Sequence, residues 1–246
     1  MNTTARIALK LIPDSLQTQP VFLCVDDTMV SKFGTKFENV SKLFDHAAHN
    51  GSNYLNGHCF VSIMLCVPVW NGDKGFYLSV PLGYRMWQKK ESKLELAASM
   101  IRQVMPEFHS KEHVIILCDS WYTKQNLVSI VEEYPNLDLI ANARVDSVIY
   151  DLAPERTGRR GRPAKHGKRL SVETDFTFSN EKIGDYYTSV RRVMTRIFRQ
   201  QGSPCLCHYH EKRAWYKTTV FQYGFSGKSA VFLRLSGKNT TESGWQ

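Results

Sequence analysis

VFLCVDDT, residues 21–28, and VIILCDSWY, residues 114–122, decide how this chain folds. Each is an apolar run that ends at acidic residues, which is typical of a buried strand whose end lies at the edge of a sheet. Strands arranged in this way would bring Asp26, Asp27 and Asp119 to a place where a divalent metal ion binds. Carboxylate oxygens select Mg²⁺ or Mn²⁺ over softer metals. An Asp after a strand also begins turns or caps helices, and for either stretch alone that alternative stays open.

The residues around these two stretches predict the other core elements. Strands are expected at residues 58–69, 76–80 and 137–141, with a hairpin turn at residues 70–75. Helical apolar spacing predicts helices at residues 93–105 and 124–133, the first of which is stopped by Pro106. Residues 33–54 predict a loop or a short helix, and residues 7–16 have helical spacing up to Pro13.

The predicted order is three antiparallel strands, helix, strand, helix and strand. This is the chain order of a ribonuclease H-like core, an α/β fold with a mixed sheet and flanking helices. We therefore expect a residual N-terminal helix at residues 1–16, the core at 17–142, a basic β-rich insertion at 143–236 and a disordered tail at 237–246.

The composition favours a polyanionic partner. The 246 residues carry a formal net charge of +9, and cationic contacts to phosphates release counterions from nucleic acid.

No apolar run approaches the length of about 20 residues that a bilayer requires, and no signal core follows the start, so we expect a cytoplasmic protein without membrane contact. Cys24, Cys66 and Cys118 lie inside apolar runs, where reduced cysteine is a small hydrophobic residue.

A basic segment at residues 156–169 has no apolar periodicity and predicts an exposed loop. The sequence Arg160-Gly161-Arg162-Pro163 resembles an AT-hook, in which arginines enter the minor groove. A solvated loop that only touches phosphates is the alternative, and both interpretations predict DNA binding. The expected DNA-binding side chains of this segment are Arg159, Arg160, Arg162, Lys165, Lys168 and Arg169.

Alternating apolar and polar residues predict further strands after this loop, at residues 171–178, 185–195, 214–222 and 229–235. Residues 205–210, CLCHYH, contain thiols and imidazoles that suit zinc. The same alternation also describes a strand, and a single cluster without a second ligand pair leaves the strand as the simpler interpretation.

Taken together, these motifs resemble the DDE transposases of bacterial insertion sequences. The resemblance rests on VDDT at residues 25–28, LCDSWY at residues 117–122 and the basic β-rich stretch, and it covers most of residues 20–235. It implies that Asp27, before Thr28, is the first metal ligand, with Asp26 as the alternative because strand alternation sends the two side chains to opposite faces.

By the same resemblance, Asp119 is the second ligand, and Mg²⁺ or Mn²⁺ activates water and then a 3′ hydroxyl for attack on DNA phosphates. Lys124 and Tyr122 are candidates for phosphate contacts, and a core position is the alternative for Tyr122. The implied partners are the double-stranded transposon ends and further copies of the chain on DNA, at the bacterial nucleoid.

The sequence departs from this family at the third carboxylate. The pattern Tyr-x-x-Arg-x-x-x-Glu does not occur after Asp119, and Glu211 is a weak substitute among strand-like segments. The resemblance therefore implies a transposase shortened at both ends that does not complete catalysis alone.

Three functions follow from these observations. The first is a DDE-type transposase catalytic domain for DNA strand cleavage and transfer. The alternative is a non-catalytic DNA-binding remnant, or an inhibitor of full-length transposase. A third is an unrelated metal-dependent nuclease of the same fold that uses Glu211.

Overall fold

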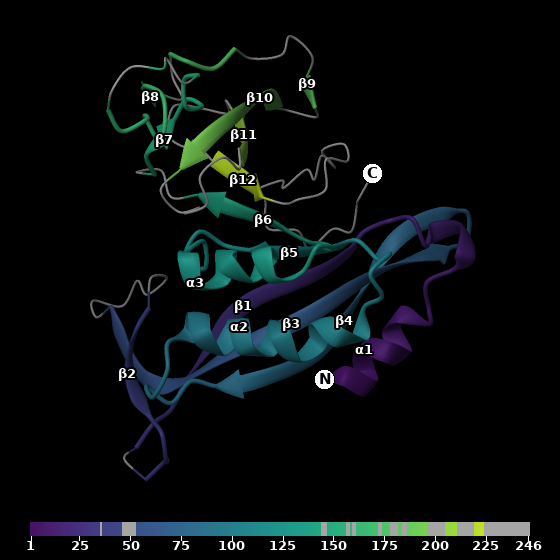
Figure 1. Ribbon diagram of the computed structural model, residues 1–246. Coiled ribbons are helices and arrows are strands. Elements are labelled where there is room, and N and C mark those ends of the chain that lie inside the picture. Colours follow the sequence, from purple (N-terminus) through teal and green to yellow (C-terminus); the bar gives the residue numbers. More distant parts are fainter. Residues whose placement is uncertain are drawn as a thin grey trace.

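The computed structural model describes residues 1–34, 36–45, 53–143, 147–155, 158, 161–171, 174–177, 182–183, 186–195, 205–210 and 219–223 (Figure 1). The helices are α1 (Asn2–Leu9), η1 (Asp14–Leu16), α2 (Lys93–Val104), η2 (Met105–Glu107), α3 (Gln125–Val128) and η3 (Ser129–Glu133). The strands are β1 (Val21–Ser31), β2 (Ser41–Phe44), β3 (Tyr54–Asn71), β4 (Lys74–Met86), β5 (Val114–Cys118), β6 (Leu137–Ala143), β7 (Ile149–Tyr150), β8 (Arg169–Leu170), β9 (Lys182–Ile183), β10 (Tyr186–Thr195), β11 (Cys205–His210) and β12 (Thr219–Tyr223).

The core sheet has the predicted succession of strands. β3 pairs antiparallel with both β1 and β4, whereas β5 lies parallel between β1 and β6. Parallel neighbours need a crossover, and the segment containing α2 connects β4 to β5 while that containing α3 connects β5 to β6. Residues 21–28 and 114–122 thus contribute adjacent strands, β1 and β5, at the centre of the core sheet.

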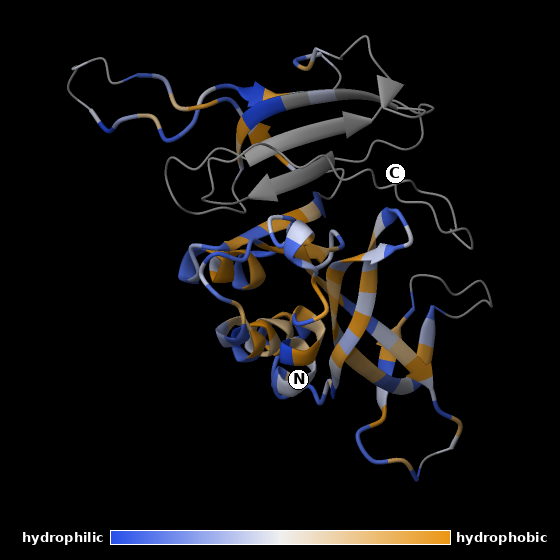
Figure 2. Ribbon diagram, turned by 90° about the vertical axis from the view of Figure 1, so that its right-hand side faces the viewer, coloured by the Kyte–Doolittle hydropathy of each residue, from blue (hydrophilic) through white to orange (hydrophobic). Residues whose placement is uncertain are grey.

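Helices cover one face of this sheet (Figure 2). Alternate residues of β1, including Leu23 and Val25, pack with α1, α2 and α3 in the larger apolar core. The intervening residue Phe22 packs on the opposite face with Ile115 and Ile140. Side chains alternate along a strand, so successive residues of β1 lie on opposite faces. The strand was expected to end at Asp26 and Asp27, but it continues to Ser31 because its pairing with β3 runs on to Gly57, and the two aspartates therefore lie in the middle of β1.

Helix α2 begins at a capping box. The Ser92 side chain accepts a hydrogen bond from the Glu95 N–H, and the Glu95 carboxylate accepts one from the Ser92 N–H. These contacts satisfy amide groups that have no partner inside the helix. The helix buries the face that contains Leu96, Met100 and Ile101, and the cap therefore fixes where Lys93 starts the helix beside the sheet.

The insertion continues the sheet. β12 pairs antiparallel with β6, and the order then runs through β11 and β10 to β7 and β8. The predicted strands at residues 185–195 and 214–222 correspond to β10 and β12, and residues 205–210 form β11. Residues 229–235 lie outside the described residues.

Several predicted elements differ in extent or type. The N-terminal helix spans Asn2–Leu9, the first part of the expected range 1–16, and its buried residues are the small Ala5 and Ala8. The helix expected at 124–133 is α-helical only over Gln125–Val128 and then tightens into a 3₁₀ helix. The expected loop at residues 33–54 contains a strand, β2, which pairs with β3.

The strand predicted at residues 171–178 is wrong where the structure describes it. Asp175 N–H donates to the Ser171 carbonyl, and the Asp175 carboxylate accepts the Ser171 N–H, at 3.0 and 2.8 Å. An aspartate that bonds nearby backbone in this way competes with strand pairing and stabilises a turn. Alternation of apolar residues carries no information about this side-chain bond.

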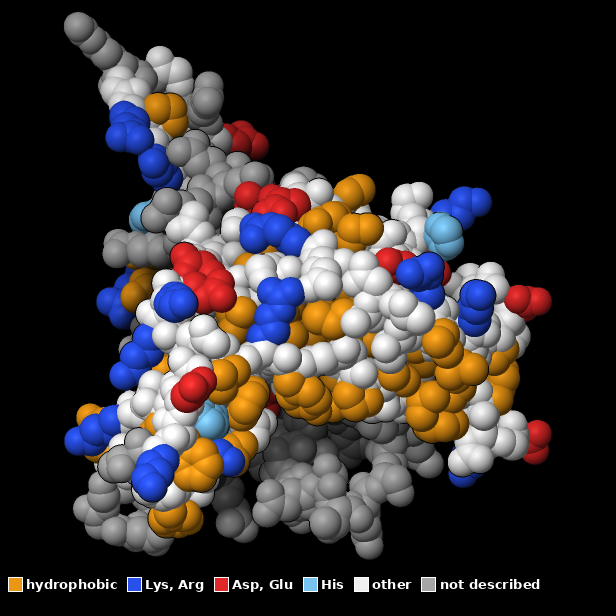
Figure 3. Space-filling view, turned by 90° about the horizontal axis from the view of Figure 1, so that it is seen from below, with side chains coloured by type: hydrophobic (Ala, Val, Ile, Leu, Met, Phe, Trp, Pro, Cys, Tyr) orange, Lys and Arg blue, Asp and Glu red, His pale blue; other side chains and the backbone are white. Residues whose placement is uncertain are grey.

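No helix in the described ranges has the length and apolar character needed to cross a membrane. On the face of the molecule in Figure 3, lysine and arginine side chains are dispersed among acidic and apolar ones.

Candidate active site

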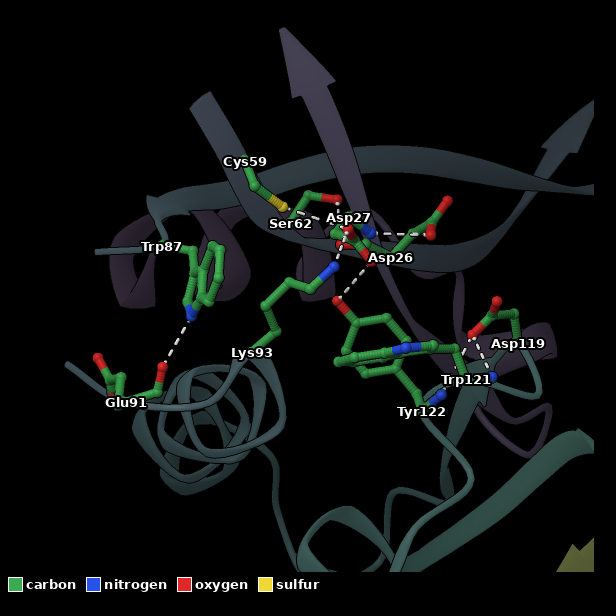
Figure 4. Close-up of polar contacts among 10 residues, drawn as sticks. All are labelled: Asp26, Asp27, Cys59, Ser62, Trp87, Glu91, Lys93, Asp119, Trp121 and Tyr122. Atoms are coloured by element: carbon green, nitrogen blue, oxygen red, sulfur yellow. Dashed lines mark hydrogen bonds and ion pairs between the residues drawn. The ribbon is translucent and has the colours of Figure 1, made fainter. Parts of the chain in front are cut away.

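Strand register brings Asp26 and Asp119 to the same place. The parallel pairing of β1 with β5 aligns Val25 with Cys118, and Asp26 and Asp119 are the next residues of the two chains. Residues aligned in this way project from one face, here the face of Phe22, which is opposite the helices. Figure 4 shows both carboxylates on one side of β1 while Lys93 approaches from the other.

Asp26 is exposed on this face of the sheet, and its negative charge is unfavourable there. Partial desolvation raises the pKa of its carboxyl most, and the charges of Asp27 and Asp119 raise it further, while the Asp27 N–H and the Lys93 charge oppose these effects. Its Oδ1 accepts the Asp27 N–H at 2.8 Å. A bound cation would relieve the repulsion between the carboxylates.

Asp119 forms a tight turn directly after β5. Its Oδ1 accepts the backbone N–H groups of Trp121 and Tyr122 at 3.0 and 3.2 Å. The Thr123 hydroxyl donates to the Asp119 carbonyl and is also 2.8 Å from the Asn142 carbonyl, so it connects the turn to β6. Asp119 therefore begins a turn, as one of the two interpretations predicted, and it uses only one of its carboxylate oxygens to do so.

Among the described residues, Oδ2 of Asp26 and Oδ2 of Asp119 accept no hydrogen bond. Two exposed carboxylates with an available oxygen each fit a hard divalent cation such as Mg²⁺ or Mn²⁺. No group of three or more acidic, His or Cys side chains suited to a metal occurs in the described part of the chain. The described site thus contains a pair of carboxylates, Asp26 and Asp119.

Asp27 faces the helices and is surrounded by donors. Lys93 Nζ lies 2.7 Å from its Oδ2, the Cys59 thiol donates to the same oxygen at 3.2 Å, and the Tyr122 hydroxyl donates to Oδ1 at 3.1 Å (Figure 4). Its side chain is 16% exposed. Both carboxylate oxygens are engaged on the opposite face from Asp119, so Asp27, the expected first ligand, does not lie with Asp119, whereas the alternative Asp26 does.

Tyr122 is fully buried, so it occupies a core position and its side chain is not accessible to a DNA phosphate. Burial and then the Asp27 carboxylate raise the pKa of its hydroxyl, which keeps it a hydrogen-bond donor. Lys124 is exposed, and its Nζ lies 4.2 Å from the centre of the Trp121 ring. Lys93 Nζ lies 4.5 Å from the same ring, so the indole is flanked by two cations.

Sequence reasoning missed Lys93 and Cys59. Lys93 follows a capping serine, and Cys59 belongs to the same alternating set as Val61 and Ile63, which face the helices. Alternation places Cys59 on the face of Asp27, and this signal was available in the sequence. No signal in the sequence indicates that α2 approaches β1 closely enough to bring Lys93 to Asp27.

The basic segment is exposed where it is described. Arg162, Lys165, Lys168 and Arg169 are exposed, while Arg159 and Arg160 lie outside the described residues. Lys168 forms an ion pair with Asp175 at 2.6 Å, so its charge is partly compensated. Glu211 and the side chains of residues 205–210 lie outside the described part of the chain, so the third-carboxylate and zinc interpretations stay predictions.

This central mixed sheet, with one carboxylate on β1 and another directly after β5, defines a nuclease-type ribonuclease H-like domain. The family model described as DDE superfamily endonuclease matches residues 2–201, and the chain belongs to this family. The predicted fold class and the DDE family are confirmed, while an origin in a bacterial insertion sequence stays a prediction. DDE superfamily endonucleases as a class cleave DNA and use divalent metal ions.

No curated protein matches the chain significantly. Among solved structures, the NurA nuclease from Sulfolobus solfataricus is similar over 90% of this chain and 76% of that chain, with 11% identity and a TM-score of 0.33. This similarity is too low to carry an argument.

Proposed function

We propose that this chain is a transposase catalytic domain that cleaves and joins DNA strands with divalent metal ions held by Asp26 and Asp119. The observation that carries the proposal is the β1–β5 register, which aligns the two carboxylates on one face of the sheet. The family supplies the class of substrate, DNA. Double-stranded element ends and further copies of the chain are the proposed partners.

Each described residue has a distinct part in this proposal. Asp26 and Asp119 would hold the metal through the oxygens that accept no hydrogen bond from a described residue, while their Oδ1 atoms accept backbone N–H groups. The metal ions, when bound, activate the attacking oxygen and neutralise charge on the phosphate. Lys124, exposed next to Trp121, contacts a DNA phosphate and so orients the strand at the carboxylates.

Two carboxylates hold a divalent ion less firmly than three, because each ligand adds charge and fixes geometry. Glu211 remains the candidate in this sequence for the third ligand. The second proposed function is therefore a non-catalytic DNA-binding protein, and it is favoured by the pairing of only two carboxylates within the described residues.

The test is nicking of supercoiled plasmid by the full chain with and without Mn²⁺. We expect Mn²⁺-dependent nicking, its loss in Asp26→Asn and in Asp119→Asn, and unchanged DNA affinity in both. Asp73→Asn, at the exposed turn between β3 and β4, is the matched control and should retain nicking. Nicking retained in both site variants would refute the assignment, and tight DNA binding without nicking by the wild type would favour the non-catalytic function.

A further inference from the structure

We propose that Asp27 and Tyr122 form a brace that positions Asp119, and that Asp27 is a positioning residue and not a metal ligand. This inference rests on the proposed function, in which Asp26 and Asp119 hold the metal. It gives adjacent residues of β1 different roles on the two faces of the sheet.

Tyr122 connects the two strands through its two ends. Its backbone N–H donates to Asp119 Oδ1 at 3.2 Å, and its side-chain hydroxyl donates to Asp27 Oδ1 at 3.1 Å (Figure 4). The ring between these contacts is fully buried in the core and packs edge-on against Trp121. A buried aromatic side chain has little freedom, so the position of the hydroxyl constrains the position of the backbone N–H.

Asp27 is a fixed anchor for this hydroxyl. The Lys93 ammonium from α2 and the Cys59 thiol from β3 both bind its other oxygen, Oδ2. Hydrogen bonds to an ionised carboxylate are roughly twice as strong as those between neutral groups. Three elements of the core, β1, β3 and α2, therefore hold the carboxylate that receives Tyr122.

The consequence is a defined orientation for Asp119. Its Oδ1 is held by the Trp121 and Tyr122 N–H groups, and its Oδ2, which accepts no hydrogen bond from a described residue, is left available on the face that Asp119 shares with Asp26. Groups that orient a metal ligand from behind typically contribute about 10- to 100-fold to metal affinity. Loosening Tyr122 should therefore weaken metal binding without removing a ligand.

The test measures direct Mn²⁺ binding by electron paramagnetic resonance, together with amide hydrogen exchange at residues 121 and 122. Tyr122→Phe removes only the hydroxyl, and Asp27→Asn keeps the size of the side chain but removes its charge. We expect each to raise the half-saturating Mn²⁺ concentration by about tenfold and to speed exchange at both amides. Tyr134→Phe, at another partly buried tyrosine, is the matched control and should change neither quantity.

A double-mutant cycle adds a second criterion. Because both substitutions act on one hydrogen bond, the double variant should bind Mn²⁺ nearly as well as the weaker single variant. Independent, multiplied effects would overturn the brace. If Tyr122→Phe does not fold, amide exchange and Mn²⁺ binding of Asp27→Asn still decide the question.

The outcomes separate this inference from the proposed function. Abolished Mn²⁺ binding in Asp26→Asn and Asp119→Asn, with unchanged binding in Tyr122→Phe, would overturn the brace and leave the function standing. Abolished binding in Asp27→Asn would make Asp27 a ligand and also overturn it. Unchanged binding in Asp26→Asn and Asp119→Asn would instead refute the metal site itself.

Discussion

At the residue scale, Lys93 shows how a single charge stabilises the core next to the site. Its ammonium and the Asp27 carboxylate are 20% and 16% exposed and lie 2.7 Å apart. Removing one member of a mostly buried pair leaves the other without compensation. We expect Lys93→Met to lower the free energy of unfolding by about 2 kcal/mol, measured by urea denaturation at neutral pH.

The exposed Lys90 supplies the control for that measurement. Lys90→Met replaces the same side chain three residues earlier and should alter the free energy of unfolding by less than about 0.5 kcal/mol. Equal losses in the two variants would show that the ion pair with Asp27 contributes no specific stability.

At the element scale, the capping box determines where α2 begins and therefore where Lys93 lies. Ser92→Ala should cost about 1 kcal/mol of stability, whereas Ser110→Ala, at an exposed loop serine, should cost little. The pKa of Glu95 is lowered by the hydrogen bonds from the Ser92 N–H and hydroxyl. Its contribution is therefore fully present above the unfolded pKa of about 4.3 and is lost as pH falls through the lower folded value.

The same box predicts a pH-dependent difference between wild type and Glu95→Ala. The melting temperatures should differ by a constant amount from neutral pH to about pH 5, and the gap should shrink as the pH falls below about 4. Thermal unfolding followed by circular dichroism across this range measures the effect. A gap that widens on acidification would contradict the bonded, ionised form of Glu95.

At the scale of the whole molecule, the net charge of +9 includes several lysines and arginines in the basic loop at residues 156–169. Arg162 and Lys165 are exposed there, whereas Arg191 is 2.9 Å from Asp151 and Lys168 is paired with Asp175. We expect Arg162→Gln with Lys165→Gln to weaken DNA binding and to reduce the slope of log affinity against log salt by about 2.

Fluorescence anisotropy with a duplex over a range of salt concentrations measures that slope. The double variant Lys10→Gln, Lys111→Gln removes the same charge from exposed positions outside the loop. An identical slope change in both double variants would show that net charge, and not the loop, determines DNA binding.

The amino-acid sequence by itself determined the order of the core elements and marked the carboxylates of two central strands, although β1 runs on to Ser31 and so places Asp26 and Asp27 in its middle, not at the predicted strand end. Apolar alternation and helical spacing are local patterns, and they correctly predicted β5 and nearly all of α2. Alternation also predicted that Asp26 and Asp27 lie on opposite faces of the strand, but it does not indicate which of the two faces carries the site.

Only the tertiary structure decided which acidic side chain of β1 lies with Asp119. The β1–β5 register aligns Asp26 with it, and the packing of α2 and Tyr122 against the other face encloses Asp27. The continuation of the sheet through β6 and β12 likewise joins segments about 80 residues apart in the chain. Register and long-range pairing depend on contacts between distant residues, whereas sequence patterns report the preferences of neighbours.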